Sequence, residues 1–304
     1  MKIIKKLKKY ILDKDYRFLV NSTKFNHFPR MSDEKYITRK FKAKTGSRLN
    51  LDNPISFNEK LQWIKLYDRN PLYTTLVDKY LVKAYVADAI GNQYIIPTIG
   101  VWDDVNDIDF NILPKQFVLK CTHDSHGLVI CNDKTKLDEK AAIKKLKEAM
   151  NKNYYLLNRE WPYRDVKPRI IAEKYMIDDE VGELRDYKFF CFNGVCKTFK
   201  IDFDRFTEHR ANYYDTDGNL LPFGEEVCLP NPEKEISMPK NLSDMIRIAE
   251  KLSKDIPFVR VDLYNVNSQV YFGEMTFFPA SGFGLFVPVE WDVILGNWME
   301  LPKR

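Results

Sequence analysis

The stretch FVRVDLYNVNSQVYFGEMTFFPASGFG, residues 258–284, contains two short runs with the composition of β-strands. The runs are FVRVDLY and QVYFGEMTF, and the turn-forming residues NVNS separate them, so the stretch predicts a β-hairpin. If the turn centres near Asn267, we expect Asp262 and Glu274 on one face, because their even separation preserves side-chain direction. Arg260 and Thr276 are expected on the same face.

Two carboxylates, an arginine and a hydroxyl on one face of an apolar hairpin are costly to bury without partners. A Mg²⁺ ion held by Asp262 and Glu274 and by nucleotide phosphates would relieve the repulsion, and Arg260 would then stabilise a phosphoryl group in transfer. The alternative is a cross-strand ion pair between Arg260 and Glu274, with Asp262 at a solvated edge. The spacing leaves both interpretations open.

Short apolar runs bounded by turn residues continue through the region that precedes the hairpin, from Tyr94 onward. They predict strands in YIIPTIGVWDDV, QFVLKC, GLVICND, RIIAEKYM, YKFFCFNG and VCKTFKID. The amphipathic stretches LDEKAAIKKLKEAMNKNYYLL and NLSDMIRIAEKLSKDI predict intervening helices. Antiparallel hairpins mixed with helices indicate an α+β fold.

Residues 1 to about 90 are predicted to be helical, since FNEKLQWIKLYD and LYTTLVDKYLVKAYVADAI place apolar residues three and four apart. Ser56 and Glu59 have the spacing of a capping box, and Gly91 supplies a stop. The first 20 residues predict a basic amphipathic helix with an apolar stripe. This helix either lies on an anionic membrane surface or packs against its own domain. The stripe consists of Ile3, Ile4, Leu7, Ile11 and Leu12.

Composition excludes several functional classes. The 48 basic and 43 acidic residues leave a formal charge of +5, which is too balanced to predict a nucleic-acid partner. No run approaches the roughly 20 apolar residues that span a bilayer, so we expect a cytoplasmic protein, with peripheral contact at the inner face of the cell membrane as an option. The 5 cysteines form no C-x-x-C pair, which indicates reduced thiols rather than a zinc site.

Two further segments are candidates for nucleotide contact. Lys120 ends an apolar strand before the turn CTHDSHG, where its amine and the turn N–H groups can reach phosphates. The two histidines of that turn, with Asp124, are too few ligands to predict a metal site. The chain from Glu173 to Met176 is predicted to leave its sheet and to offer free backbone groups to an adenine edge, although any edge strand offers such groups.

In chain order, these segments resemble the ATP-grasp superfamily. VDKYLVKAYVADAIGNQYIIPTIGV is similar to the helix and strand that open its nucleotide region, which gives Lys79 a phosphate-facing role. FVLKC is similar to the second lysine-bearing strand, so Lys120 maps to the other nucleotide lysine. AEKYM is similar to the interdomain hinge, and the resemblance assigns Glu173, Lys174 and Met176 to adenine and ribose.

The hairpin resembles the metal motif of the same superfamily. By that match Asp262 and Glu274 hold Mg²⁺, Arg260 stabilises the transferring phosphoryl group, and Thr276 replaces the usual asparagine as third ligand. SFNEKLQWIKLYDRNPLYTTLVDKY, the FNG turn and FGEMTF-x-P-x-SGFG resemble the TupA-like branch, which is associated with teichuronopeptide and surface-polysaccharide biosynthesis. Lys188 is a further expected cleft residue, with Arg185, Asp186 and Lys200, although strand alternation also explains these four.

The resemblance implies an ATP-grasp fold of two α+β lobes that clasp ATP and Mg²⁺. We expect a helical section at 1–90, a lid lobe at 91–172 and a C-terminal lobe at 173–304. The expected reaction is ATP-dependent amide formation between a carboxylate of a cell-surface polysaccharide, or its precursor, and an amino acid or other amine. Alternatives are a sugar or alcohol phosphotransferase, a glycosyltransferase, and a membrane-surface binding module with a degenerate ATP fold.

Overall fold

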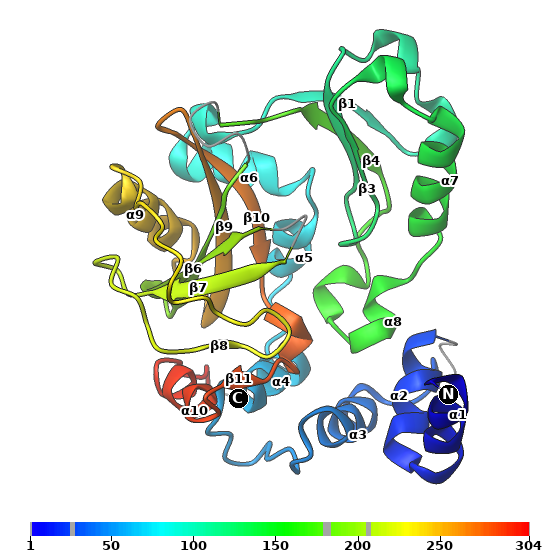
Figure 1. The fold of residues 1–304 in the computed structure, drawn as a ribbon, viewed down its shortest axis with the longest axis vertical. Helices are drawn as coiled ribbons and strands as arrows, with labels where there is room; N and C mark the ends of the chain where they lie inside the picture. The colour runs from blue at the N-terminus through cyan, green and yellow to red at the C-terminus, as the bar shows by residue number, and fades with distance from the viewer. Residues whose placement is uncertain (1, 25–27, 179–183, 205–207, 304) are drawn as a thin grey trace.

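The larger of two antiparallel sheets contains the predicted hairpin. The computed structural model describes residues 2–24, 28–178, 184–204 and 208–303 (Figure 1). Five strands run in the order β10–β9–β5–β6–β7, and the two-residue turn between β9 and β10 has positive φ at Asn267 (51°) and Ser268 (64°), as a type I′ turn requires. The strands are β5 (Asp186–Phe192), β6 (Val195–Phe203), β7 (Arg210–Tyr214), β9 (Phe258–Val266) and β10 (Gln269–Thr276).

The smaller sheet stands opposite the larger one and has the order β1–β4–β2–β3, all antiparallel (Figure 1). Because β4 lies between β1 and β2, the alternative that this segment is an edge strand is wrong. The prediction that the chain leaves its sheet at Glu173 is also wrong, since Glu173 pairs with Thr98 and Val118. The antiparallel sheets and intervening helices confirm the α+β prediction. The strands are β1 (Thr98–Trp102), β2 (Phe117–Cys121), β3 (Leu128–Cys131) and β4 (Ile170–Lys174).

Three stretches predicted as single helices are each divided in two. Residues 1–20 break at Asp13, whose Oδ1 accepts the N–H groups of Asp15 (2.9 Å) and Tyr16 (2.8 Å). Asp78 Oδ1 accepts the N–H groups of Tyr80 (2.8 Å) and Leu81 (3.1 Å), so a short-range cap interrupts the second stretch between α5 and α6. Asn153 Oδ1 accepts the Leu156 N–H (3.3 Å) at the start of α8. The elements are α5 (Leu72–Val77), α6 (Val82–Ile90), α7 (Glu139–Met150) and α8 (Tyr154–Asn158).

The remaining helices include one that the sequence did not predict. The Ser56–Glu59 capping box at the start of α4 is confirmed in both of its hydrogen bonds, and Gly91 ends α6 with φ 112°. A helix near the C-terminus, α10, and the two-residue strands β8 and β11 were not predicted. Their bounds are α4 (Phe57–Tyr67), α9 (Leu242–Leu252), α10 (Glu290–Asn297), β8 (Gly224–Glu225) and β11 (Phe286–Val287).

Two buried apolar clusters correspond to the two sheets. The cluster of the larger sheet also includes Phe57, Leu61, Leu76 and Val86 from α4, α5 and α6. The smaller sheet has its own cluster, closed by Leu146 of α7. Residues 57–90 therefore share a core with the C-terminal lobe, although the sequence grouped them with the helical section.

Helices α1 (Lys2–Leu12), α2 (Lys14–Lys24) and α3 (Asp33–Thr45) project from that core beside α8 (Figure 1). Leu7, Ile11 and Leu12 of α1 are exposed, so the prediction that the stripe packs on its own domain is wrong for these side chains. Among the described residues, no helix has the length and apolar character needed to cross a membrane.

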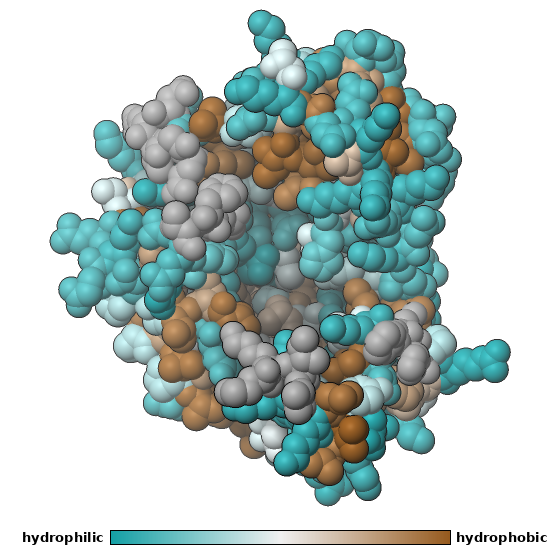
Figure 2. All heavy atoms as spheres, turned by 45° about the vertical axis from the view of Figure 1, so that its right-hand side comes forward, coloured by the Kyte–Doolittle hydropathy of each residue, from teal (hydrophilic) through white to brown (hydrophobic). Residues whose placement is uncertain are grey.

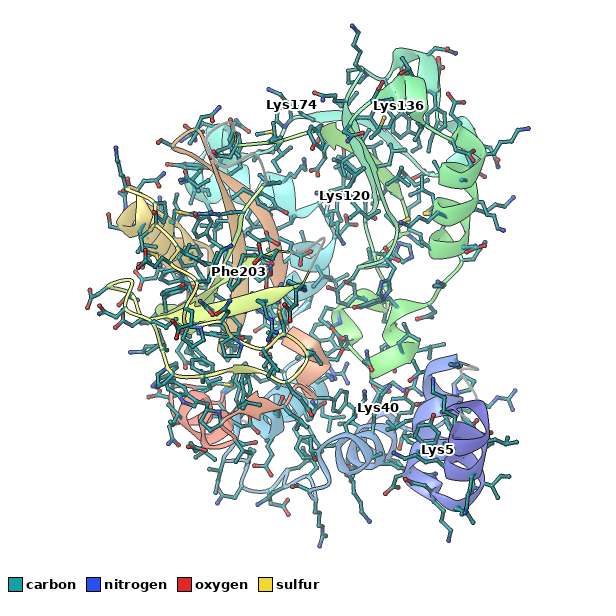
Figure 3. All side chains as sticks on the ribbon, viewed as in Figure 1. Lys5, Lys40, Lys120, Lys136, Lys174 and Phe203 are labelled. Carbon is teal, nitrogen blue, oxygen red and sulfur yellow. The ribbon has the colours of Figure 1, made fainter. Side chains whose placement is uncertain are left out.

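Lys40 joins α3 to α8 (Figure 3). Its Nζ donates to the Leu157 carbonyl (2.6 Å), which also accepts the Tyr36 hydroxyl (2.8 Å). Lys40 is buried, and burial, with the positive charges of Lys65, Lys44 and Arg159, lowers its pKa to about 7. Below that pH, the buried charge of the Lys40 ammonium therefore lowers the stability of the folded state.

Replacing Lys40 with methionine is expected to make the free energy of unfolding less dependent on pH. The unfolded chain keeps this proton up to about pH 10, whereas the folded chain loses it near 7, so stability rises with pH between those values. Lys40→Met removes the buried charge, so it should raise the free energy of unfolding by about 1–3 kcal/mol more near pH 6 than near pH 9. Urea denaturation at both pH values measures it. Lys42→Met, at an exposed position of α3, is the matched control and should leave the pH dependence of the wild type.

Candidate active site

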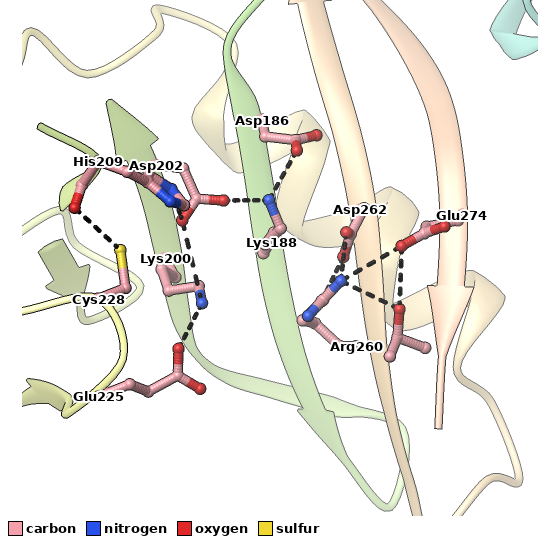
Figure 4. A network of polar contacts seen from close by, with 11 residues as sticks. Asp186, Lys188, Lys200, Asp202, His209, Glu225, Cys228, Arg260, Asp262 and Glu274 are labelled. Atoms are coloured by element: carbon pink, nitrogen blue, oxygen red, sulfur yellow. Dashed lines mark hydrogen bonds and ion pairs between the residues drawn. The ribbon is translucent and has the colours of Figure 1, made fainter. Parts of the chain in front are cut away.

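A row of four charged residues crosses the larger sheet. Strand register pairs Lys200 with Lys188, Lys188 with Asp262, and Asp262 with Glu274. Directly paired residues point to the same side of a sheet, so two lysines and two acids from four strands share one face (Figure 4). The opposite face of these strands is apolar, because Val261 and Leu263 are buried in the core.

A β-bulge at Gly273 places Glu274 on this face. The two-residue turn pairs Val266 with Gln269 and Leu263 with Phe272, and regular pairing would then set Gly273 opposite Asp262. The register shifts by one residue after Phe272, so that Glu274 lies opposite Asp262. The prediction that Asp262 and Glu274 share a face is confirmed. Their even separation in the sequence does not explain it, because without the bulge Glu274 would point into the core.

Arg260 joins the acids of the hairpin. Its Nε and Nη2 donate to the two Asp262 oxygens, each at 2.6 Å, and Nη2 lies 3.4 Å from Glu274 Oε1. Thr276 Oγ1 accepts from the same Nη2 at 3.0 Å. The cross-strand Arg260–Glu274 ion pair is present, but Asp262 is 2% exposed, so its predicted place at a solvated edge is wrong.

Burial is the dominant influence on the Asp262 carboxyl. It raises the pKa of Asp262, and the charges of Arg260 and Lys188 oppose that increase. Glu274 is much more accessible, with a side chain 43% exposed. The hairpin thus holds one buried and one accessible carboxylate on neighbouring strands.

Lys188 is surrounded by acids on the same face. Its Nζ donates to Asp186 Oδ2 (2.6 Å) and to Asp202 Oδ2, and it also feels the charge of Asp262. Burial would lower the pKa of Lys188, but the three carboxylates together raise it above its ordinary value. Lys188 is therefore a charged ammonium at neutral pH, in the middle of the row.

Strand β6 extends the network away from the hairpin. Lys200 Nζ donates to Glu225 Oε2 at 2.7 Å. Asp202, His209 and Cys228 place one potential metal ligand atom each within 4.8 Å of one another, a group that the sequence analysis missed because the three residues are far apart in the chain. Since Asp202 already contacts Lys188 and lies near Lys200 (Figure 4), nearby cations balance its charge.

Across from this sheet, two lysines hold Glu173 on β4. Lys120 Nζ lies 2.7 Å from Glu173 Oε2, and Lys83 Nζ lies 2.5 Å from Oε1. Burial would raise the pKa of Glu173, but the two ammonium groups outweigh it and lower the pKa. The sequence analysis missed Lys83. The sequence offered one indication of it, because Lys83 follows Lys79 by four residues in the same predicted helix.

Lys79 lies at the break between α5 and α6, next to the 122–127 turn. Its N–H donates to the Thr122 carbonyl (3.2 Å), and its Nζ donates to the Asp124 carbonyl. Asp124 in turn accepts the Gly127 N–H (2.9 Å). The helix break and the turn thus fix the position of the Lys79 amine.

A cavity of about 330 Å³ separates these two groups of residues, and Figure 2 shows the molecule hollowed between its lobes, with hydrophilic walls. Six of the ten predicted site residues line it. From the smaller sheet and its approach come Lys79, Lys120 and Glu173, and from the larger sheet Lys188, Asp262 and Glu274. Asp124, Asp186 and Tyr264 are further lining residues.

The other four predicted residues occupy different positions. Arg260 and Thr276 bind the acids from beside the cavity. Lys174 is exposed at the end of β4 (Figure 3), and Met176 packs in an apolar cluster with Ile96 and Val266. Their roles toward a nucleotide remain predictions.

The charged side chains that line the cavity fit the Mg²⁺ ion and nucleotide phosphates that the hairpin predicts. Two carboxylates on neighbouring strands supply the hard oxygen ligands that Mg²⁺ prefers, and Mg²⁺ commonly takes one or two carboxylates plus phosphate oxygens. Lys79 and Lys120 face them from the opposite wall, where ammonium groups can neutralise phosphate charge. The arrangement suits a triphosphate with a divalent ion.

Comparison with known proteins gives a family match and several similar solved structures. The TupA-like ATP-grasp family model matches residues 59–300. Among curated proteins, none matches this chain in sequence. Similar solved structures include D-alanine–D-alanine ligases from Bacillus anthracis, complexed with ATP (16% identity, TM-score 0.43, 74% of this chain and 63% of that chain), and from Helicobacter pylori (14%, 0.45, 82% and 68%).

A third similar structure is the ATP-grasp ligase PsnB with minimal precursor, Mg and ADP (12% identity, TM-score 0.38, 72% of this chain and 57% of that chain). The chain thus spans less than two thirds of the length of PsnB and of the Bacillus anthracis ligase. The family match covers most of the chain and includes both walls of the cavity. The chain belongs to the TupA-like ATP-grasp family, and its fold is the ATP-grasp fold.

Proposed function

We propose that this protein is an ATP-dependent carboxylate–amine ligase. The observation that carries the proposal is the cavity between the sheets, where Asp262 and Glu274 face Lys79 and Lys120. Carboxylates that hold a divalent ion, opposite amines that neutralise phosphates, suit phosphoryl transfer, which depends mainly on positioning and charge stabilisation. Mg²⁺, when bound, would offset the charge of the phosphate oxygens.

The proposed chemistry has two steps. A substrate carboxylate oxygen attacks the γ-phosphorus of ATP, the bond to the β-phosphate oxygen breaks, and ADP leaves. An amine then attacks the carbonyl carbon of the acyl phosphate, phosphate leaves, and the amine loses a proton. In this proposal Lys188 and Arg260 are the charged donors that stabilise the phosphoryl oxygens in transfer, and Asp262 and Glu274 would hold the metal.

We further propose that the carboxylate belongs to an anionic saccharide or polymer of the cell surface, or its precursor, and that the amine is an amino acid or a related compound. A basic groove of about 660 Å³ on α3 supports an anionic acceptor. Its cations include Lys35, Arg39, Lys42 and Arg48. Among the described residues, no ion pair involves Lys35, Lys42 or Arg48, so their charge is available to a polyanion.

We place the proposed reaction in the cytoplasm, where ATP is available. The five cysteines support this location, because all are free and buried rather than paired. A reducing compartment keeps such thiols reduced.

The test is ATP turnover by the purified protein with sets of uronic-acid saccharides and amino acids. A ligase releases ADP and phosphate only when carboxylate and amine are both present, and forms an amide that mass spectrometry detects. A stable phosphorylated product without any amine requirement would instead identify a phosphotransferase. Thermal stabilisation by a nucleotide sugar, and none by ATP with Mg²⁺, would identify a glycosyltransferase. Binding of neither would favour a membrane-surface module.

A further inference from the structure

Helix α1 has exposed apolar side chains beside exposed lysines. Leu7, Ile11 and Leu12 are 59%, 60% and 70% exposed, and Leu7 and Ile11 lie on the same side, because they are four residues apart. The helix sequence KIIKKLKKYIL contains five lysines and no acidic residue. Lys5, Lys6, Lys8 and Lys9 are all exposed.

Polar contacts fix the orientation of α1 while leaving that apolar side uncovered. The Tyr10 hydroxyl donates to Asn21 Oδ1 of α2 (2.7 Å), and Arg17 Nη1 donates to the Ile11 carbonyl at the end of α1 (2.8 Å). Helix α2 in turn packs on α3, where the rings of Phe18 and Tyr36 lie 5.6 Å apart. The helix is thus tied to the body of the protein without burying Leu7 or Ile11.

The lysines and apolar side chains of α1 together indicate which kind of partner can bind this surface. A second copy of the helix would bring lysines against lysines, and like charges repel. A soluble polyanion would pair with the lysines but leave the apolar side chains in water. A membrane with anionic lipids suits both the lysines and the apolar side chains. Its head groups can pair with the lysines, and Leu7 and Ile11 can insert at the boundary with the acyl chains.

We propose that α1 is a membrane-surface anchor that lies in the interface of an anionic bilayer. The apolar side chains enter the boundary between head groups and acyl chains, and the lysines contact lipid phosphates (Lys5 is labelled in Figure 3). This inference does not depend on the proposed reaction, since it uses no residue of the cavity.

Vesicle sedimentation of the full chain tests the anchor. Wild-type protein should sediment with mixed phosphatidylglycerol–phosphatidylcholine vesicles far more than with phosphatidylcholine alone. Leu7→Gln with Ile11→Gln should weaken that binding by roughly tenfold or more. Lys5→Gln with Lys8→Gln should weaken it by roughly fivefold per lysine at low salt, and this difference should vanish near 1 M salt, where charges are screened within about 3 Å.

Matched controls change equally exposed residues elsewhere. Val227→Gln removes an apolar side chain that is 80% exposed, and Lys144→Gln with Lys147→Gln removes two exposed lysines of α7. All variants should keep the wild-type circular dichroism, and the controls should bind vesicles like wild type. Wild-type binding by the Leu7 and Ile11 variant overturns the proposal. So does a change in oligomeric state by sedimentation velocity without any change in vesicle binding.

Discussion

Glu274→Gln is expected to lower ATP turnover by roughly 10²–10³-fold while leaving the protein folded. The glutamate side chain is 43% exposed and lies 3.4 Å from Arg260, so loss of its charge changes the free energy of unfolding by less than about 1 kcal/mol. In the proposed site its carboxylate is nevertheless one of the two that would hold Mg²⁺ on the hairpin. Asp262→Asn should lose turnover to the same extent, but at a larger cost in stability, because its carboxylate is buried against Arg260.

The glutamate variant separates the two interpretations of the hairpin. In a merely structural Arg260–Glu274 ion pair, the amide would leave turnover close to wild type. Steady-state kinetics across a Mg²⁺ titration makes the measurement, and a metal ligand predicts that the variant needs more Mg²⁺. Glu148→Gln, at an exposed position on α7, is the control and should match wild type. Full activity in Glu274→Gln would remove the hairpin from the proposed mechanism.

Lys188→Met is expected to destabilise the protein by about 3–5 kcal/mol. The ammonium is buried between Asp186 and Asp202 and also neutralises Asp262, so its removal leaves uncompensated carboxylates inside the sheet. Urea denaturation near neutral pH measures the loss. Lys144→Met on α7, an exposed lysine, should stay within about 0.5 kcal/mol of wild type.

A second substitution tests the cause of that loss. Lys188→Met combined with Asp202→Asn removes one of the acids that Lys188 neutralises, so the pair should be more stable than Lys188→Met alone. If the double variant loses the sum of both single losses, charge compensation is not the reason for the burial of Lys188.

The sequence was sufficient for elements governed by short-range rules. The capping box at Ser56 and Glu59 involves atoms three residues apart, and the hairpin of residues 258–276 follows from alternation around an Asn-containing turn. The lysine-bearing strand β2, which ends at Cys121, was likewise predicted from its composition and flanking turn. Each of these depends on neighbours in the chain, so a local pattern carries the information.

The site depended on contacts that no local pattern contains. The breaks at Asp78 and Asn153 divide stretches whose apolar periodicity continues, because a side-chain cap competes with the helix. Lys83 belongs to the site because its amine forms an ion pair with Glu173, which is 90 positions away in the chain. The exposure of Leu7 and Ile11 could not be predicted either, since periodicity defines an apolar side but not what covers it.

The amino-acid sequence by itself determined the α+β class, the family, and the residues that supply acids and amines to the cavity. Tertiary structure alone decided how they meet. A one-residue bulge at Gly273 turns Glu274 from the core side to the Asp262 side of the hairpin, and strand order sets Lys188 beside Asp262. The physical reason is that side-chain direction alternates along a strand, so a single shift in register, fixed by packing, decides which charges share a face.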